Sequence, residues 1–198
     1  MSDIRNDKKL YVVSDGYIKK LQKEDYRVQN NYKGNRLYYK SKLTVPDNED
    51  VNYYIPLSSA KESQKKINNQ SVFKIYGSEN DSEDFLGVLH VNNMIPVPDS
   101  KAKQWEPNNG NTDERYNMLI IKQSKFIFKN VDQIEKQAQL LFDSNNNNVD
   151  PEYFKKNKRN RSEIMLYKRI MPDLKKLEDV SIKENKKENR QDLEYDFN

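Results

Sequence analysis

The chain contains no cysteine, and this absence removes several kinds of site at once. Without thiols there is no disulfide framework, no thiolate zinc site and no cysteine nucleophile. His90 is the only histidine in 198 residues, which excludes a two-histidine metal site and a pair of catalytic histidines. The acidic run at residues 79–84 lacks the glycine and terminal glutamate of a calcium loop, and no glycine-rich phosphate loop is present. We therefore expect no metal and no cofactor.

Long hydrophobic runs are also missing. No segment approaches the roughly 18 apolar residues that a membrane-spanning helix needs, and the first nine residues lack the apolar core of a signal peptide. We therefore expect a cytoplasmic protein with no membrane partner. Only 34% of the residues are hydrophobic and 33% are charged, with a net charge of +4. The 13 tyrosines and 7 phenylalanines nevertheless favour a folded core, because disordered chains are usually poor in aromatic residues.

The order of the segments predicts a single α+β domain. Strands are expected at residues 10–13, 36–45, 51–57, 71–76, 85–91 and 94–97, and helices at 14–25, about 62–69, 112–143 with a break near Asn130, and 150–171. Residues 46–50 and 77–84 are expected to be loops, and residues 99–111 to be irregular. Strands first and helices around and after them are typical of an antiparallel sheet with helices. We place the domain at residues 1–171, with a helical C-terminal part at about 150–171, and a charged C-terminal tail at residues 172–198, whose end we expect to be mobile or loosely docked.

A first candidate site lies at the end of a predicted strand, where Ser58, Ser59 and Lys61 follow one another. Hydroxyls can donate hydrogen bonds to a phosphate, and an ammonium can neutralise its charge. The alternative is that one of the serines caps the following helix while Lys61 is solvated.

Two further segments combine positive charge with features that suit RNA. Alternation in the strand at 36–45 places Arg36, Tyr38, Lys40 and Lys42 on one face, after a loop that holds Tyr32 and Lys33. The helix at 150–171 is strongly basic, and its candidate RNA-binding residues are Lys155, Lys158, Arg159 and Arg161. The alternative for both is a solvated surface. His90 lies in an apolar strand, where a lone histidine is usually structural.

Taken in order, these segments resemble the ToxN/AbiQ family of endoribonuclease toxins from type III toxin–antitoxin and phage abortive-infection systems. The run Ile55–Lys61 is close to the family's Pro-Leu-(Ser/Thr)-Ser-Pro-Lys. The helix Ser14–Leu21, the Tyr32 to Arg36 loop, the run Asn93–Pro98 and the helix that contains Met118–Ile127 follow in the family's order. The resemblance covers residues 10–142.

The resemblance implies a strongly twisted antiparallel sheet similar to that of MazF/Kid-type toxins, surrounded by helices. It implies metal-independent, sequence-selective cleavage of single-stranded, often A-rich RNA. It also implies inhibition by a repeated RNA that folds as a pseudoknot. The expected partners are therefore this antitoxin RNA and the target mRNA, with a protein that is monomeric alone and enters a higher-order assembly with RNA.

The family's site residues carry over by position. Tyr17 matches the helix tyrosine near the site, Tyr32 matches the loop tyrosine, and Ser58, Ser59 and Lys61 match the Ser/Thr-Ser-x-Lys core. Arg36 falls where relatives carry lysine or arginine, with Lys33 as a close competitor. One departure is Ala60, which replaces the usual proline.

In RNA cleavage of this kind, the 2′-hydroxyl attacks the phosphate and leaves a 2′,3′-cyclic phosphate and a 5′-hydroxyl. Lys61 and Arg36 would stabilise the phosphate, Ser58 and Ser59 would donate to it, and the acid and base remain open between Lys61 and Tyr32. The alternative, favoured by Ala60, is a non-catalytic RNA-binding module. A third possibility is an interaction protein whose charged tail binds a protein partner.

Overall fold

The α+β prediction is confirmed by a computed structural model, which describes residues 9–43, 45, 51–78, 83–107, 113–156 and 159–195. The strands are β1 (Leu10–Val13), β2 (Leu37–Lys40), β3 (Tyr53–Ser59), β4 (Phe73–Tyr76), β5 (Phe85–Leu89), β6 (Ile95–Pro96) and β7 (Ala102–Gln104). The α-helices are α1 (Asp15–Glu24), α2 (Glu62–Lys65), α3 (Glu114–Lys129), α4 (Val131–Asn145), α5 (Pro151–Lys156), α6 (Arg159–Ile170) and α7 (Leu174–Tyr195). Short 3-10 turns are η1 (Tyr32–Gly34), η2 (Val91–Asn93) and η3 (Asp99–Lys101).

The sheet is antiparallel throughout and centred on β3. Its order is β4-β5-β3-β2-β1-β7, and β6 pairs with β3 beside this path. One edge of β3 pairs with β2, so that Pro56 lies opposite Tyr38. The other edge pairs first with β6 and then with β5, which places Ser59 opposite Gly87. Strand β3 is therefore paired with β2 up to Pro56, and its last three residues, Leu57–Ser59, are held by β5.

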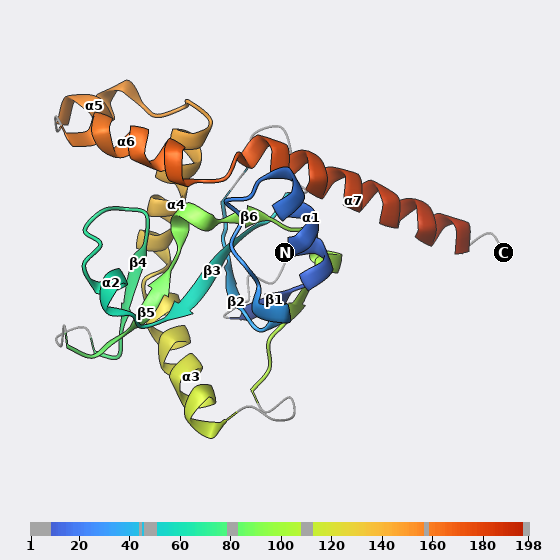
Figure 1. The fold of residues 1–198 in the computed structure, drawn as a ribbon, viewed down its shortest axis with the longest axis horizontal. Helices are drawn as coiled ribbons and strands as arrows, with labels where there is room; N and C mark the ends of the chain where they lie inside the picture. Colours follow the sequence, from blue (N-terminus) through green and yellow to red (C-terminus); the bar gives the residue numbers. More distant parts are fainter. Residues whose placement is uncertain are drawn as a thin grey trace, which may run out of the picture.

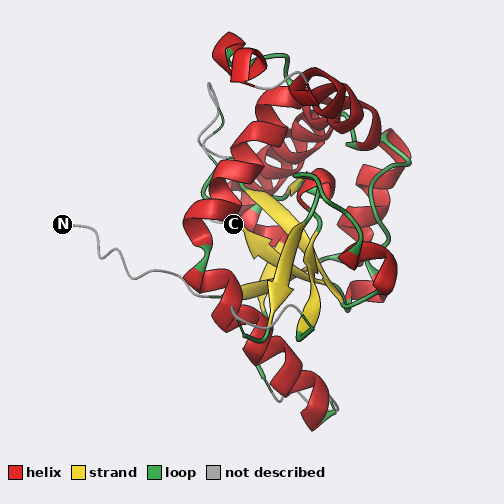
Figure 2. Ribbon diagram, turned by 90° about the vertical axis from the view of Figure 1, so that its left-hand side faces the viewer, coloured by secondary structure: helices red, strands yellow, loops and turns green. Residues whose placement is uncertain are grey.

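The central strands are covered on both faces, and each face has its own core. Tyr53 and Ile55 of β3 belong to the larger core, which contains the apolar residues of α3 and α4. Tyr54 belongs to the second core, together with Tyr17 and Leu21 of α1. The helices accordingly flank the strands on both sides (Figures 1 and 2). The alternation of residues along β3 thus separates two buried surfaces.

This arrangement corrects the expected cationic, aromatic strand face. Strand β2 ends at Lys40, and Tyr38 is 1% exposed within the second core, where its hydroxyl donates to Asn31 Oδ1. Tyr38 is therefore not an RNA-binding residue on an open surface. The expectation fails because a tyrosine ring is apolar enough for either core once its hydroxyl has a partner.

Other differences lie at the ends of elements. The helix expected at about 62–69 is reduced to the short α2, and the irregular stretch at 99–111 contains β7, which pairs with β1 at the edge of the sheet. The predicted break near Asn130 is confirmed, because Asn130 separates α3 from α4. The basic segment at 150–171 is split into α5 and α6. The predicted turn at 46–50 and the loop residues 79–82 lie outside the described residues.

The segment expected to be a charged tail forms helix α7, and its beginning is part of the core. Leu174 and Leu177 are fully buried, one in each core. Tyr53 donates to Glu178 at 2.5 Å, and Lys20 of α1 pairs with Glu184 at 2.8 Å. The segment has few apolar residues, but Val180 and Ile182 also pack against these cores, so its apolar residues anchor the first half of the helix.

Asp25 ties the start of α7 to the end of α1. Its carboxylate accepts hydrogen bonds from Arg27 and from the backbone N–H of Asp173. Burial acts to raise the pKa of Asp25, but these hydrogen bonds outweigh it and lower the pKa to about 2. The carboxylate therefore stays charged, and the tie stays intact, at physiological pH.

Replacing Leu177 tests whether α7 is part of the folded domain. Leu177→Ala should lower the free energy of unfolding by about 2–5 kcal/mol, because it empties a fully buried site. Lys176→Ala, one residue away and exposed, should change it by less than about 0.5 kcal/mol. Urea unfolding followed by circular dichroism measures both, and equal stabilities for the two variants would contradict the packing of α7.

Candidate active site

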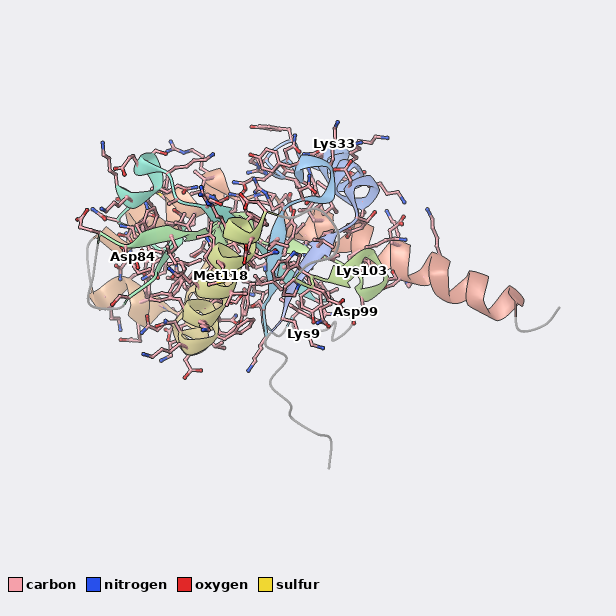
Figure 3. All side chains as sticks on the ribbon, turned by 90° about the horizontal axis from the view of Figure 1, so that it is seen from below. Lys9, Lys33, Asp84, Asp99, Lys103 and Met118 are labelled. Carbon is pink, nitrogen blue, oxygen red and sulfur yellow. The ribbon has the colours of Figure 1, made fainter. Side chains whose placement is uncertain are left out.

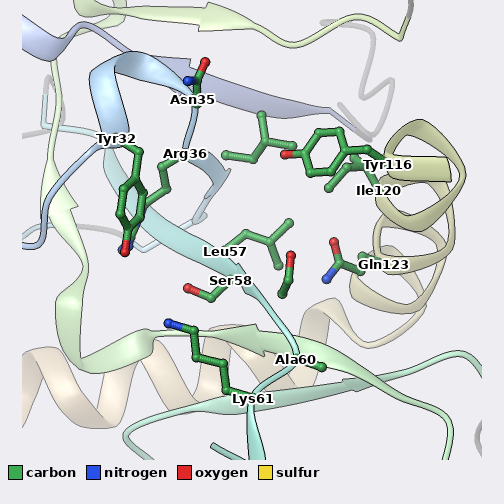
Figure 4. Close-up of a pocket in the computed structure, with 12 residues that line it drawn as sticks. Tyr32, Asn35, Arg36, Leu57, Ser58, Ala60, Lys61, Tyr116, Ile120 and Gln123 are labelled. Carbon is green, nitrogen blue, oxygen red and sulfur yellow. The ribbon is translucent and has the colours of Figure 1, made fainter. Parts of the chain in front are cut away.

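A cavity of about 300 Å³ opens where the end of β3, the loop before β2 and the first half of α3 meet (Figure 4). It brings together five of the six predicted catalytic residues. The lining residues are Tyr32, Asn35, Arg36, Leu37, Leu57, Ser58, Ser59, Ala60, Lys61, Tyr116, Ile120 and Gln123. Segments that are far apart in the sequence thus supply hydroxyls, an ammonium, a guanidinium and an amide to one space.

Ser58 and Ser59 are the last residues of β3 and do not cap a helix. They pair with Val88 and Gly87 of β5. The residue at the N-cap of α2 is Lys61, and it makes no side-chain capping bond. The capping alternative is therefore wrong. Figure 4 shows the Lys61 ammonium and the Ser58 hydroxyl directed toward the same side of the cavity.

Gly87 allows β5 to approach this strand end. Its φ of +150° is a backbone conformation that other residues rarely adopt. A Cβ at this position would lie 2.1 Å from the backbone oxygen of Ser58 and 2.8 Å from Gln123 Nε2. Only glycine therefore permits this close packing of β3, β5 and α3.

The loop before β2 is held in an unusual conformation by Asn31. Tyr32, Lys33 and Gly34 all have positive φ values, of 48°, 59° and 84°. The Asn31 side chain donates to the Val13 carbonyl at 2.7 Å, and its backbone oxygen accepts from the N–H of Gly34 at 3.0 Å. Left-handed conformations of residues other than glycine cost about 1–2 kcal/mol each. The loop is thus fixed in place by hydrogen bonds that offset this cost.

Arg36 lines the cavity, whereas Lys33 points into solvent, so the structure favours Arg36 as the cation of the site. The guanidinium carbon lies 4.9 Å from the centre of the Tyr32 ring. Its Nη1 donates to Gln29, and its buried Nε has no hydrogen-bond partner among the described residues. This contact with the Tyr32 ring helps to hold Arg36 in place. Because Tyr32 is 57% exposed, its ring also offers a face to a ligand.

His90 lies directly behind Ser58, which the sequence did not reveal. Its Nε2 is 3.1 Å from Ser58 Oγ and 3.3 Å from Gln64 Nε2. When the imidazole proton is on Nδ1, His90 Nε2 is an acceptor and the Ser58 hydroxyl donates to it. The signal that would have located His90 is the register of β3 and β5, because it places the residue after β5 beside the end of β3.

His90 is neutral at physiological pH. Burial, which is the largest cause, and the positive charges of Arg36 and Lys61 together lower its pKa to about 4. A neutral imidazole can accept a proton, so Ser58 connects the cavity to a base.

Tyr17 does not line the cavity, although it was predicted to lie in the catalytic site. It is buried in the second core, and its hydroxyl donates to the Pro96 carbonyl at 2.9 Å. Burial raises the pKa of Tyr17 well above its ordinary value. In this structure Tyr17 therefore holds α1 against β6.

The remaining predicted RNA-binding residues are spread over the surface. Lys40 pairs with Asp99 at 2.9 Å, and Lys42 is exposed next to α4. Figure 3 shows Lys33 well separated from Asp99, the partner of Lys40.

The predicted basic helix lies at another end of the molecule. Lys155 on α5 is exposed and pairs with Glu152, and Arg161 on α6 is exposed. Arg159 begins α6, and Lys158 lies outside the described residues. Figure 1 shows α5 and α6 at the opposite end from the part of α3 that borders the cavity. The structure does not bring this helix to the candidate site.

Metal-binding clusters and membrane-spanning helices are both absent from the part of the chain that the structure describes. No cluster of three or more histidine, aspartate or glutamate side chains there is arranged to hold a metal ion. None of the helices in that part of the chain has the length and apolar character needed to cross a membrane.

Comparison with known proteins gives concordant matches. The family model for the toxin ToxN of type III toxin–antitoxin systems matches residues 9–182. The endoribonuclease ToxN of Bacillus thuringiensis subsp. kurstaki is 29% identical over 140 residues, which are 70% of this chain and 69% of that protein. The endoribonuclease AbiQ of Lactococcus lactis subsp. lactis is 36% identical over 104 residues, 50% of this chain and 55% of AbiQ.

Solved structures share the fold. One solved structure comes from work on selective toxin inhibition by a non-coding RNA pseudoknot in bacterial type III toxin–antitoxin systems. It matches this chain with a TM-score of 0.71 and 26% identity, over 89% of this chain and 97% of that one. The structure of AbiQ, a lactococcal anti-phage endoribonuclease, has a TM-score of 0.67 and 24% identity, covering 90% and 98%. The chain therefore belongs to the ToxN family of type III toxin–antitoxin toxins, as the sequence resemblance indicated.

The single histidine makes the electrostatics of the cavity directly measurable. In untagged protein, the one imidazole signal in an NMR titration belongs to His90 and should have a midpoint near pH 4. In Lys61→Ala the midpoint should rise toward 6.5, because a nearby positive charge is removed. A midpoint near 6.5 in the wild type would contradict the buried, cation-flanked setting.

The same pKa has a consequence for stability. Because the folded-state pKa lies below 6.5, the unfolded chain binds the additional proton, and His90 favours folding above pH 6.5. This contribution should be lost as the pH falls from 6.5 toward 4. His90→Gln should show a weaker loss of stability over that range when the two proteins are unfolded with urea at each pH.

Proposed function

We propose that this protein is a metal-independent endoribonuclease toxin that cleaves single-stranded, A-rich RNA by attack of the 2′-hydroxyl. The observation that carries the proposal is the convergence of Ser58, Ser59, Lys61, Arg36 and Tyr32 on one cavity. Hydroxyl donors and two cations are what a phosphate needs while negative charge develops on it. The B. thuringiensis and L. lactis relatives, both named as endoribonucleases, support the same activity.

In the proposed reaction, the 2′-oxygen forms a bond to phosphorus while the bond from phosphorus to the 5′-oxygen breaks. The products are a 2′,3′-cyclic phosphate and a 5′-hydroxyl. Lys61 and Arg36 neutralise the phosphate, and the exposed hydroxyl of Ser59 donates to it. Tyr32 provides a ring face at the cavity for an unstacked base.

The proton of the 2′-hydroxyl leaves through Ser58 to Nε2 of His90, along the 3.1 Å contact between them. A bound phosphate assists this transfer, because it offsets the charges of Arg36 and Lys61 that lower the pKa of His90. Lys61 then donates a proton to the leaving 5′-oxygen. Lys61 and Ser58 are directed toward the same side of the cavity, which supports this division of roles (Figure 4).

The proposed biological setting is phage abortive infection with control by RNA. The related structure describes toxin inhibition by a non-coding RNA pseudoknot, and AbiQ is described as an anti-phage endoribonuclease. For this chain we propose inhibition by an antitoxin RNA of pseudoknot repeats that occupies the same cavity as the target mRNA. We further propose that the protein is a cytoplasmic monomer which enters a higher-order assembly only with that RNA.

Alanine substitutions at the strand end test the activity. With end-labelled A-rich RNA in excess EDTA, Lys61→Ala and Ser59→Ala should reduce cleavage at least about 100-fold, because each removes a group that stabilises the charged phosphate. Lys19→Ala is the matched control. It removes an exposed lysine that pairs with Asp15 on α1 and should leave the rate unchanged. Mapping of the product ends should show a cyclic phosphate only with active proteins.

Two outcomes would contradict this proposal. Cleavage by Lys61→Ala at the wild-type rate would show that the catalytic site does not lie at the end of β3. RNA retention without cleavage by the wild type would instead favour the non-catalytic RNA-binding module, for which the exposed Ala60 in place of the family's proline is the supporting feature.

A further inference from the structure

The inner wall of the cavity carries a buried amide whose oxygen has no partner. Gln123 of α3 lines the cavity and is 0% exposed. Its Nε2 donates to the Leu86 carbonyl at 2.9 Å, while its Oε1 has no hydrogen-bond partner among the described residues. Figure 4 shows this amide directed from α3 into the cavity, toward the end of β3.

The orientation of the amide is fixed by its neighbour. A backbone carbonyl can only accept a hydrogen bond, so the nitrogen of Gln123 must face Leu86 and the oxygen must face away from it. A buried acceptor without a donor is unfavourable, and such groups are rare in native proteins. A ligand that brings a donor to Oε1 would satisfy it.

The surroundings of Gln123 suit a flat, partly apolar ligand. Tyr116, Ile120, Leu37 and Leu57 line the same cavity. The amide offers an acceptor at Oε1 and, after its bond to Leu86, one remaining N–H donor. Adenine presents an amino donor beside a ring-nitrogen acceptor on both of its polar edges, and glutamine pairs with it through two hydrogen bonds. Cytosine has this order of groups on one edge only.

The base position would adjoin the phosphate position. The backbone oxygen of Ser58 and Nε2 of Gln123 lie 2.1 Å and 2.8 Å from the same point, the position that a Cβ of Gly87 would occupy, so the two groups are neighbours. A nucleotide whose phosphate meets Ser58 and Lys61 can therefore extend its base toward Gln123.

We propose that Gln123 is the residue that selects adenine beside the cleaved phosphate. Its Oε1 accepts from the adenine amino group, and its free N–H donates to the neighbouring ring nitrogen. The inference rests on the proposed ribonuclease function, because it assigns the base of the RNA that the same cavity holds. It adds a specificity-determining residue that lies outside the strand-end motif.

Binding of short oligonucleotides that lack the attacking hydroxyl tests this proposal separately from cleavage. The probes are fluorescent 2′-deoxy hexamers of adenine, of purine (adenine without its amino group), of cytosine and of uracil, measured by anisotropy at constant salt. The wild type should bind the adenine hexamer about 5- to 150-fold more tightly than the purine hexamer, which is the discrimination expected of one such pair. It should also favour adenine over cytosine and uracil.

Gln123→Met should bind the adenine and purine hexamers equally, since methionine has a similar length but no amide. Gln133→Met makes the same change at an exposed position of α4 and should keep the wild-type ratio. Equal binding of the two hexamers by the wild type would overturn the proposal, and that comparison needs no variant to fold. A ratio that survives in Gln123→Met, or a preference for cytosine, would overturn it as well. If the wild type prefers adenine but cleaves no RNA, the role of Gln123 in base selection is supported, and only the proposed ribonuclease activity is refuted.

Discussion

The register between β3 and β5 is the constraint on which the candidate site depends. It places Gly87 opposite Ser59, and the missing Cβ of Gly87 lets the Ser58 backbone and the Gln123 amide lie against the same residue. It also brings His90, which follows β5, against the Ser58 side chain. A shift by one residue would reverse every side chain of β5 and separate these groups. The chemistry of the cavity is therefore specified by strand pairing as much as by the serine–lysine motif.

Two opposite electrostatic demands meet in the small space that this pairing creates. A phosphate site needs positive charge, which Arg36 and Lys61 supply. A proton acceptor needs to be neutral, and the same two charges, after burial, keep His90 in that state. One arrangement meets both demands because the imidazole lies behind Ser58 and the cations lie around the cavity. In the proposed reaction, Ser58 carries the proton from the RNA in the cavity to the imidazole of His90.

The sequence predicted most strands, the position of the α3–α4 break and the residues at the strand end, because these depend on local patterns. It failed where tertiary packing decides. Tyr38 was expected on an open face, yet β2 is covered on both sides. His90 and Gln123 were not assigned to the site, because neither adjoins the motif in sequence and only strand register and helix packing bring them there. The order of motifs in the family resemblance supplied the remaining site residues, with Tyr17 as the one that packs elsewhere.

The burial of Leu174 and Leu177 has a consequence for how such a protein is made. Neither core is complete until the segment that begins α7 has been synthesised, and the candidate cavity is built on a sheet that lies between those cores. A polypeptide whose translation stops before Leu174 would hold every residue of the cavity but would lack the side chains that close the domain around it. Because both cores would then lack one of their buried leucines, we expect such a shortened chain to be less stable than one that contains the start of α7.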